Sequence, residues 1–91
     1  MDVNERIERF RELVRQDPEN DMAYFTLGGA YAQAERHADA AEAYIKCTEL
    51  NTSMSKAFQL AGQSLIAADE KEMAAQVLAN AGIEVWMGKV L

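Results

Sequence analysis

The chain has 91 residues, of which 49% are hydrophobic and 26% are charged, and its net charge is −6. This composition is typical of one small globular domain. The acidic balance excludes nucleic acid and membrane surfaces as partners, because both require clustered Lys and Arg. The single cysteine and the lack of a signal-peptide core or of a roughly 20-residue apolar span indicate a cytoplasmic protein.

Every element that the sequence predicts is a helix. Asp2 followed by Glu5 is typical of a capped helix start, and the apolar stripe that follows is formed by Ile7, Phe10, Leu13 and Val14. This first helix ends before Asp17-Pro18, because proline disfavours helical geometry in the residue before it. Asn20 or Asp21 then caps a second helix at about 21–35.

The second half of the chain continues the helical pattern. A short turn at Glu35-Arg36-His37 precedes a third helix, which runs to about Leu50 and has Ala40, Ala41, Tyr44 and Cys47 on its inner side. Ser53 is the predicted cap of a fourth helix at about 54–68, and Asp69 that of a fifth at about 70–82.

The aromatic, glycine and alanine positions recur at a constant spacing of about 34 residues, which we call the repeat length. The matched pairs are Tyr24 and Phe58, Leu27 and Ala61, Gly28 and Gly62, Tyr31 and Leu65, Ala40 and Ala74, and Tyr44 and Leu78. This period indicates units of two helices that stack into a solenoid, an architecture that usually provides a binding surface.

The paired glycines predict close helix packing. Gly28 and Gly62 lie mid-helix, where glycine is about 1 kcal/mol less favourable than alanine. A neighbouring helix that comes very close would explain them, with Ala40 and Ala74 as the matching flat surface.

These positions resemble the tetratricopeptide repeat (TPR). The unit at 21–54 is similar at Tyr24, Leu27, Gly28, Tyr31, Ala40 and Tyr44, and has Cys47 where the family has alanine. The unit at 55–88 is similar at Phe58, Gly62, Ala74 and Ala81, but has Ala61 and Leu65 where the family has Leu and Tyr. Residues 2–20 resemble the second helix of a preceding unit. The resemblance implies that residues 1–91 form a single all-α, TPR-like superhelix of about five helices.

A narrower likeness involves Arg9-Phe10-Arg11, Asp17-Pro18-Glu19-Asn20 and the run from Ser55 to Gly62. These segments resemble short TPR modules of bacterial proteins, some of which follow an iron(II)-trafficking-type domain. Nothing in residues 1–91 is itself an iron site, so this likeness concerns context alone.

The TPR resemblance implies a non-enzymatic protein-interaction module that binds a peptide or protein segment on its concave face. Carried over position by position, the main contact residues are Met22, Phe25, Gly29, Gln33, Lys56, Gln59, Gln63 and Ile66. Such a face is apolar near Met22 and Phe25, carries glutamine amides, and has Lys56 as its lone cation.

No catalytic, cofactor-binding or metal-binding site is predicted. No nucleophile, base and orienting group occur in a recognisable order. Cys47 is expected to be an inert packed thiol, and His37 a surface turn residue without the further ligands that a metal needs.

The apolar C-terminus suggests an alternative function. Trp86, Met87 and Leu91 would be unusual side chains to leave in water, because exposed apolar patches commonly mark interaction sites. The alternative to peptide binding is therefore a structural role, in which these residues join two copies of the chain in a homodimer and Trp86 is at least half buried.

Overall fold

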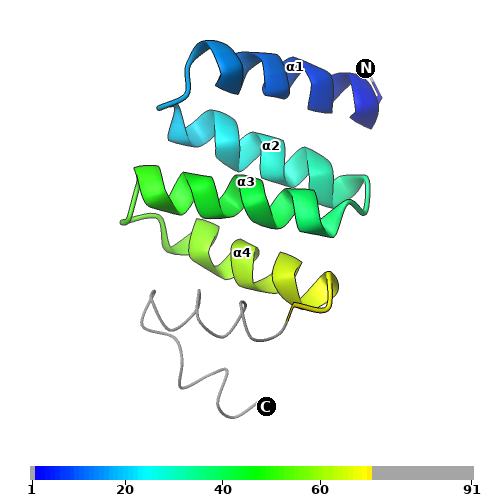
Figure 1. Ribbon diagram of the computed structural model, residues 1–91, viewed down its shortest axis with the longest axis vertical. Coiled ribbons are helices and arrows are strands. Elements are labelled where there is room, and N and C mark those ends of the chain that lie inside the picture. Colours follow the sequence, from blue (N-terminus) through cyan, green and yellow to red (C-terminus); the bar gives the residue numbers. More distant parts are fainter. Residues whose placement is uncertain (1, 71–91) are drawn as a thin grey trace.

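The computed structural model describes residues 2–70, and all of its regular structure is helical (Figure 1). The four helices of this part are α1 (Val3–Gln16), α2 (Asp21–Gln33), α3 (His37–Leu50) and α4 (Ser55–Ala67). Each helix packs against the next one in the chain, and successive helices run in opposite directions. The prediction of an all-α chain is confirmed for these residues. The fifth helix predicted at about 70–82 lies outside them.

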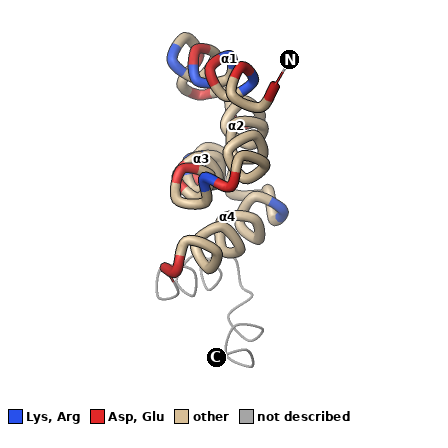
Figure 2. The backbone as a smooth tube through the Cα atoms, turned by 90° about the vertical axis from the view of Figure 1, so that its right-hand side faces the viewer, with Lys and Arg blue, Asp and Glu red and all other residues tan. Residues whose placement is uncertain are grey.

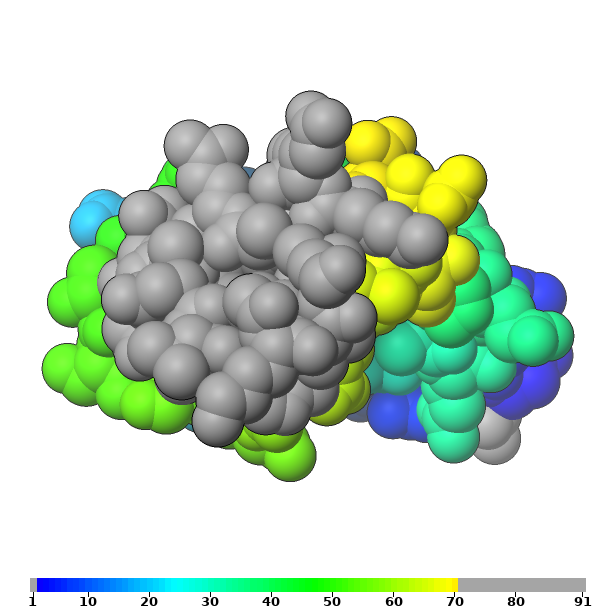
Figure 3. All heavy atoms as spheres, turned by 90° about the horizontal axis from the view of Figure 1, so that it is seen from below, coloured from blue at the N-terminus to red at the C-terminus, as the bar shows by residue number. Residues whose placement is uncertain are grey.

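The antiparallel order brings distant parts of the chain to the same edge. Figure 3 looks along the stack from the α4 end, with the α2–α3 turn and the end of α4 at one edge and the α3–α4 turn at the other. Two side-chain hydrogen bonds connect the elements at these edges. Arg6 of α1 donates to Gln33 at the end of α2, and Asn51 after α3 donates to Asp21 at the start of α2 with a distance of 2.8 Å.

Side-chain caps determine where the first two helices begin. The carboxylate of Asp2 accepts a hydrogen bond from the backbone N–H of Glu5 at 2.8 Å. The amide oxygen of Asn20 accepts one from the N–H of Ala23 at 3.0 Å. Each bond satisfies an N–H that has no partner inside its own helix. Both caps are confirmed, and of the two candidates for α2 the cap is Asn20.

The starts of α3 and α4 differ from the sequence predictions. Ser53 is not the cap of α4, because Met54 holds that position and makes no side-chain capping bond. Instead, the backbone N–H of Ser53 donates to the side chain of Asn51 at 3.1 Å, which forms a tight turn. His37, expected in a turn, is the first residue of α3.

Two helices end at a residue in the left-handed region. Glu35 after α2 has φ 61° and Asp69 after α4 has φ 64°. Asp69, predicted to cap a fifth helix, therefore lacks the extended backbone of a capping residue and ends α4 instead. Paired backbone hydrogen bonds close both ends in the Schellman pattern. They run from Glu35 N to Ala32 O (3.0 Å), Arg36 N to Tyr31 O (2.9 Å), Asp69 N to Ile66 O (3.0 Å) and Glu70 N to Leu65 O (2.7 Å).

The backbone repeats at the same spacing as the side chains. Each boundary of α3 and α4 falls one repeat length after the corresponding boundary of α1 and α2, and the two left-handed residues have the same spacing. The pairs are Val3 and His37, Gln16 and Leu50, Asp21 and Ser55, Gln33 and Ala67, and Glu35 and Asp69. The chain therefore uses one helix-pair geometry twice within the described residues.

The core is built mainly from alanines and a few large side chains. One cluster draws on all four helices and consists of Ile7, Leu27, Ala30, Tyr31, Ala40, Ala43, Tyr44 and Ala61. The predicted inner side of α3 is confirmed, since Ala40, Ala41, Tyr44 and Cys47 are all buried. Leu13, predicted in the inner stripe of α1, is instead 37% exposed.

Gly28 allows α2 to approach α3 closely. A β-carbon at this position would lie 2.7 Å from Cε1 and 2.8 Å from Cδ1 of the Tyr44 ring, which is closer than atoms in contact allow. The predicted close approach is therefore confirmed, although the nearest atoms belong to Tyr44 and not to Ala40. The ring of Tyr44 is also held by Phe25, edge to face, with 5.7 Å between the ring centroids.

We expect Gly28→Ala to lower the free energy of unfolding by about 1–2 kcal/mol, because the added methyl group overpacks the contact with Tyr44. Gly29→Ala is the matched control, since its β-carbon would be 3.7 Å from the hydroxyl of Tyr44 and has room. That variant should be neutral or more stable by up to about 1 kcal/mol, because alanine favours the helix. Urea denaturation of both variants measures the difference, and equal stabilities would contradict the proposed contact.

We expect Glu35→Gly to raise the free energy of unfolding by about 1 kcal/mol, because a left-handed backbone strains every residue that has a β-carbon. Glu42→Gly, at a helical position in α3, should lower it by about the same amount. Thermal or urea unfolding of the two variants checks the opposite signs. A loss of stability in Glu35→Gly would show that its side chain has a role that the backbone geometry does not reveal.

Candidate functional site

The eight predicted contact residues lie on two helices. Met22, Phe25, Gly29 and Gln33 belong to α2, and Lys56, Gln59, Gln63 and Ile66 belong to α4. Within each helix the residues are three or four positions apart, so they line one side of it. Figure 2 shows α2 set to one side of α3, with α4 crossing the stack obliquely below α3 from the side of α2. We call this set of eight residues the α2/α4 face.

Most of these side chains are accessible to solvent. Met22 is 54% exposed, which is unusual for a long apolar side chain. The polar members Gln33, Lys56, Gln59 and Gln63 are exposed as well, whereas Phe25, Gly29 and Ile66 are half-buried. The α2/α4 face therefore presents an apolar residue near the start of α2 and a row of amides along α4.

Two members of the face also have structural roles. The side chain of Gln33 accepts a hydrogen bond from Arg6, which ties the end of α2 to α1. The ring of Phe25 packs against the core and meets Tyr44 edge to face. Loss of either side chain would therefore disturb the fold as well as a ligand contact, so Met22, Gln59 and Gln63 are the better residues for testing function.

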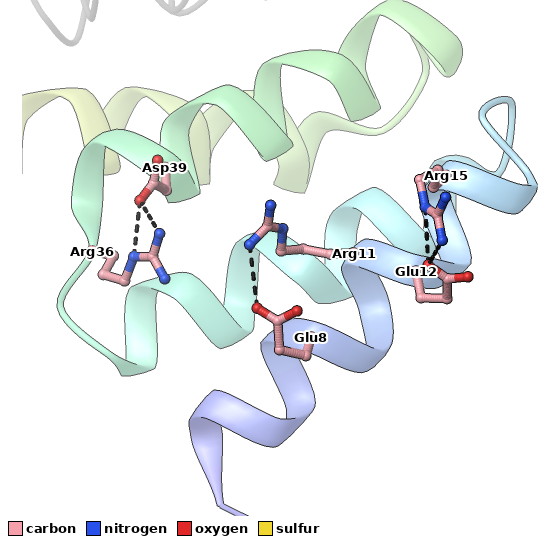
Figure 4. Close-up of polar contacts among 6 residues, drawn as sticks. All are labelled: Glu8, Arg11, Glu12, Arg15, Arg36 and Asp39. Atoms are coloured by element: carbon pink, nitrogen blue, oxygen red, sulfur yellow. Dashed lines mark hydrogen bonds and ion pairs between the residues drawn. The ribbon is translucent and has the colours of Figure 1, made fainter.

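Charge divides the molecule into two kinds of surface. Asp21 is the charged residue of α2 and Lys56 is that of α4, so the α2/α4 face is nearly neutral. Several charged side chains of α1 and α3, and Arg36 just before α3, form exposed ion pairs (Figure 4), which join Glu8 to Arg11, Glu12 to Arg15, and Arg36 to Asp39. The bond from Arg15 holds the pKa of Glu12 below its ordinary value. Exposed pairs of this kind contribute little to stability.

A groove between α2 and α3 was missed by the sequence analysis. It has a volume of about 330 Å³, and its lining includes Tyr24, Leu27 and Tyr31 of α2 and Asp39, Glu42 and Lys46 of α3. In the sequence, Tyr24 and Tyr31 stand out only as positions of the repeat. Two features of the sequence could have indicated the groove. Tyr24 and Tyr31 are seven residues apart and so lie on one side of α2, and the charged residues Asp39, Glu42 and Lys46 lie three and four residues apart on α3.

Cys47 is fully buried, as the sequence predicts. Its sulfur lies 3.5 Å from that of Met54. Burial raises the pKa of the thiol, and the negative charge of Asp21 raises it further, so the group stays protonated at neutral pH. Burial also raises the pKa of Tyr44, with a smaller contribution from Cys47.

The remaining predictions concern absences and the C-terminus. In the part that the structure describes, no three or more His, Cys, Asp or Glu side chains gather where they could hold a metal ion. None of the described helices has the length and apolar character needed to span a membrane. Trp86, Met87 and Leu91, predicted to join two copies of the chain, lie outside the described residues.

We expect the free energy of unfolding to fall as the pH rises above about 9, because the folded state keeps Cys47 and Tyr44 protonated while both groups ionise in the unfolded chain near their ordinary pKa values of 9.0 and 10.0. Cys47→Ala removes the thiol and should show a smaller decrease between about pH 8 and pH 10. Urea denaturation across this range compares the two slopes. Parallel curves would mean that the thiol ionises equally easily in both states.

Comparison with known proteins adds no assignment. A scan against protein-family models gives no match, and a search of curated protein sequences gives no significant similarity. What the chain does is therefore inferred from its own surfaces, which are the nearly neutral α2/α4 face and the charged side formed by α1 and α3.

Proposed function

We propose that the chain is a non-enzymatic, TPR-like interaction module whose α2/α4 face binds a peptide segment of another protein. The proposal rests on one observation. The α2/α4 face is accessible and nearly uncharged, although the protein as a whole has a net charge of −6. A surface that only had to be soluble would be expected to carry charges, as the outer sides of α1 and α3 do.

The repeated backbone supports the TPR-like part of the proposal. The helix boundaries recur at the same repeat length as the side chains, and Gly28 packs against an aromatic ring of the following helix. Repeats of this length form superhelices whose first helices line a concave surface. In this interpretation α2 and α4 are the first helices of two successive units, and the α2/α4 face is that surface.

The side chains indicate the chemistry of the ligand. Met22 offers a flexible apolar contact of the kind that adapts to different partners. The amides of Gln59 and Gln63 can each donate and accept, which suits the backbone of an extended peptide. Lys56 is the one charge of the face, so the preferred segment is uncharged and apolar, with room for one acidic residue at the Lys56 end.

We expect Gln59→Glu and Gln63→Glu together to weaken binding of an apolar peptide by at least about tenfold, because each new charge must be desolvated against an uncharged ligand. The peptides would be selected from a displayed random library with the full chain and measured by calorimetry. Gln16→Glu adds one charge on α1 outside the face, where it also removes the bond that the Gln16 amide donates to Glu12, and this control should leave peptide binding unchanged.

Two further outcomes separate this proposal from other kinds of binding. Affinity for the selected peptides should change little between low and high salt, since the face offers few charges for counterions to screen. Equal binding by the double variant and the parent, with both folded by circular dichroism, would show that the peptides bind elsewhere and would contradict the proposal.

A further inference from the structure

The groove between α2 and α3 opens on a different side of α2 from the α2/α4 face. Its residues Tyr24, Leu27 and Tyr31 each follow a member of the face by two positions. Two positions correspond to about 200° around a helix, so the groove residues of α2 and the α2 members of the face point in nearly opposite directions. A ligand in the groove would therefore not compete with one on the α2/α4 face.

The groove is apolar at its base and aromatic along α2. Leu27 and Ala43 are each 5% exposed, which places them at the bottom. Tyr24 and Tyr31 stand two helical turns apart on the same side of α2. An apolar base between two aromatic rings suits the methylene stem of a long side chain whose head group stays in water.

One end of the groove already holds a guanidinium group. The Arg36 side chain lies over the ring of Tyr31, with 4.7 Å between its central carbon and the ring centroid. Its Nε donates a hydrogen bond to one oxygen of Asp39 at 2.9 Å, and a terminal nitrogen forms an ion pair with the same oxygen at 2.8 Å (Figure 4). A tyrosine ring on α2 and a carboxylate on α3 thus bind a guanidinium here by stacking and charge together.

The lining of the groove includes a second tyrosine, Tyr24, and a second carboxylate, that of Glu42. Glu42 follows Asp39 by about one turn of α3, is exposed, and has no ion pair with any described residue. Lys46 on the same rim has its charge partly offset by Glu49, 3.8 Å away. The excess negative charge of the whole protein would also draw a cation towards this rim.

We propose that the groove between α2 and α3 binds an arginine side chain of a partner protein. The methylene stem lies over Leu27 and Ala43, the guanidinium is paired with Glu42, and the Tyr24 ring stacks on it. Arginine suits this arrangement better than lysine, because its planar head group can stack on a ring and pair with a carboxylate at once. Arg36 with Tyr31 and Asp39 shows that a ring of α2 and a carboxylate of α3 can hold one guanidinium together within this chain.

The test uses the isotope-labelled full chain and the peptide acetyl-Gly-Arg-Gly-amide as the probe. NMR titration should shift the ring protons of Tyr24 and Tyr31 and the amide of Glu42, with an affinity no tighter than about millimolar, because an exposed ion pair and a cation–π contact each contribute little. The same peptide with citrulline has a neutral head group of nearly the same shape, and it should bind at least about fivefold more weakly.

Two variants of equal charge complete the test. Glu42→Gln should weaken binding of the arginine peptide by about fivefold, whereas Glu19→Gln removes an exposed carboxylate outside the groove and should leave it unchanged. Both positions are exposed, so both variants are expected to fold. Equal binding of the arginine and citrulline peptides, an equal effect of the two variants, or shifts confined to the α2/α4 face would overturn the proposal.

Discussion

The close contact between Gly28 and Tyr44 determines how α2 and α3 pack. Because the backbone of α2 rests directly on the tyrosine ring, the two helices approach more closely than side chains of ordinary size would allow. The ring cannot easily withdraw, since it is buried and Phe25 packs against it in a T-shaped contact. The alanines of the core match this short separation, because larger residues would not fit between helices so close together.

This packing accounts for the composition of only one side of α2. The helix is held between α1 and α3, so part of its surface must be apolar to bury itself, yet the remainder also carries almost no charge. Burial cannot account for an exposed Met22 or for the amides that line α4. The charged side chains belong to α1 and α3, where ion pairs and solvent satisfy them.

Much of the fold could be predicted because its determinants are local. Asp17-Pro18 ends α1, Asn20 caps α2, and a regular spacing marks the repeat, so each boundary depends on a few neighbouring residues. Ser53 was assigned wrongly because the side chain of Asn51 engages its N–H and changes the turn, a competition between two polar residues that propensity alone does not decide.

The errors that remain concern packing between helices. Leu13 stands one repeat length before Cys47, yet Cys47 lies on a helix that packs against helices on both sides, whereas α1 packs mainly against α2 among the described helices. The groove was missed for a similar reason. Its walls come from two helices, and only their relative placement leaves Tyr24 beside a space instead of inside the core. For the α2/α4 face, the positions were carried over from the resemblance to the TPR, which gives no indication of the bond between Gln33 and Arg6.

The repeat of the helix boundaries has a consequence for how this protein can change in length. The pairing of α3 with α4 reproduces that of α1 with α2, with Ala41 and Leu65 at the positions that Ile7 and Tyr31 hold one unit earlier. Duplicating residues 21–54 within the gene would insert a helix pair and create one new junction, in which α3 packs against the copied α2 and Ala41 faces Tyr31 in place of Leu65. Growth by a whole unit would therefore keep the helix-pair geometry, with one interface left to adapt, and each added unit would extend both surfaces of the stack.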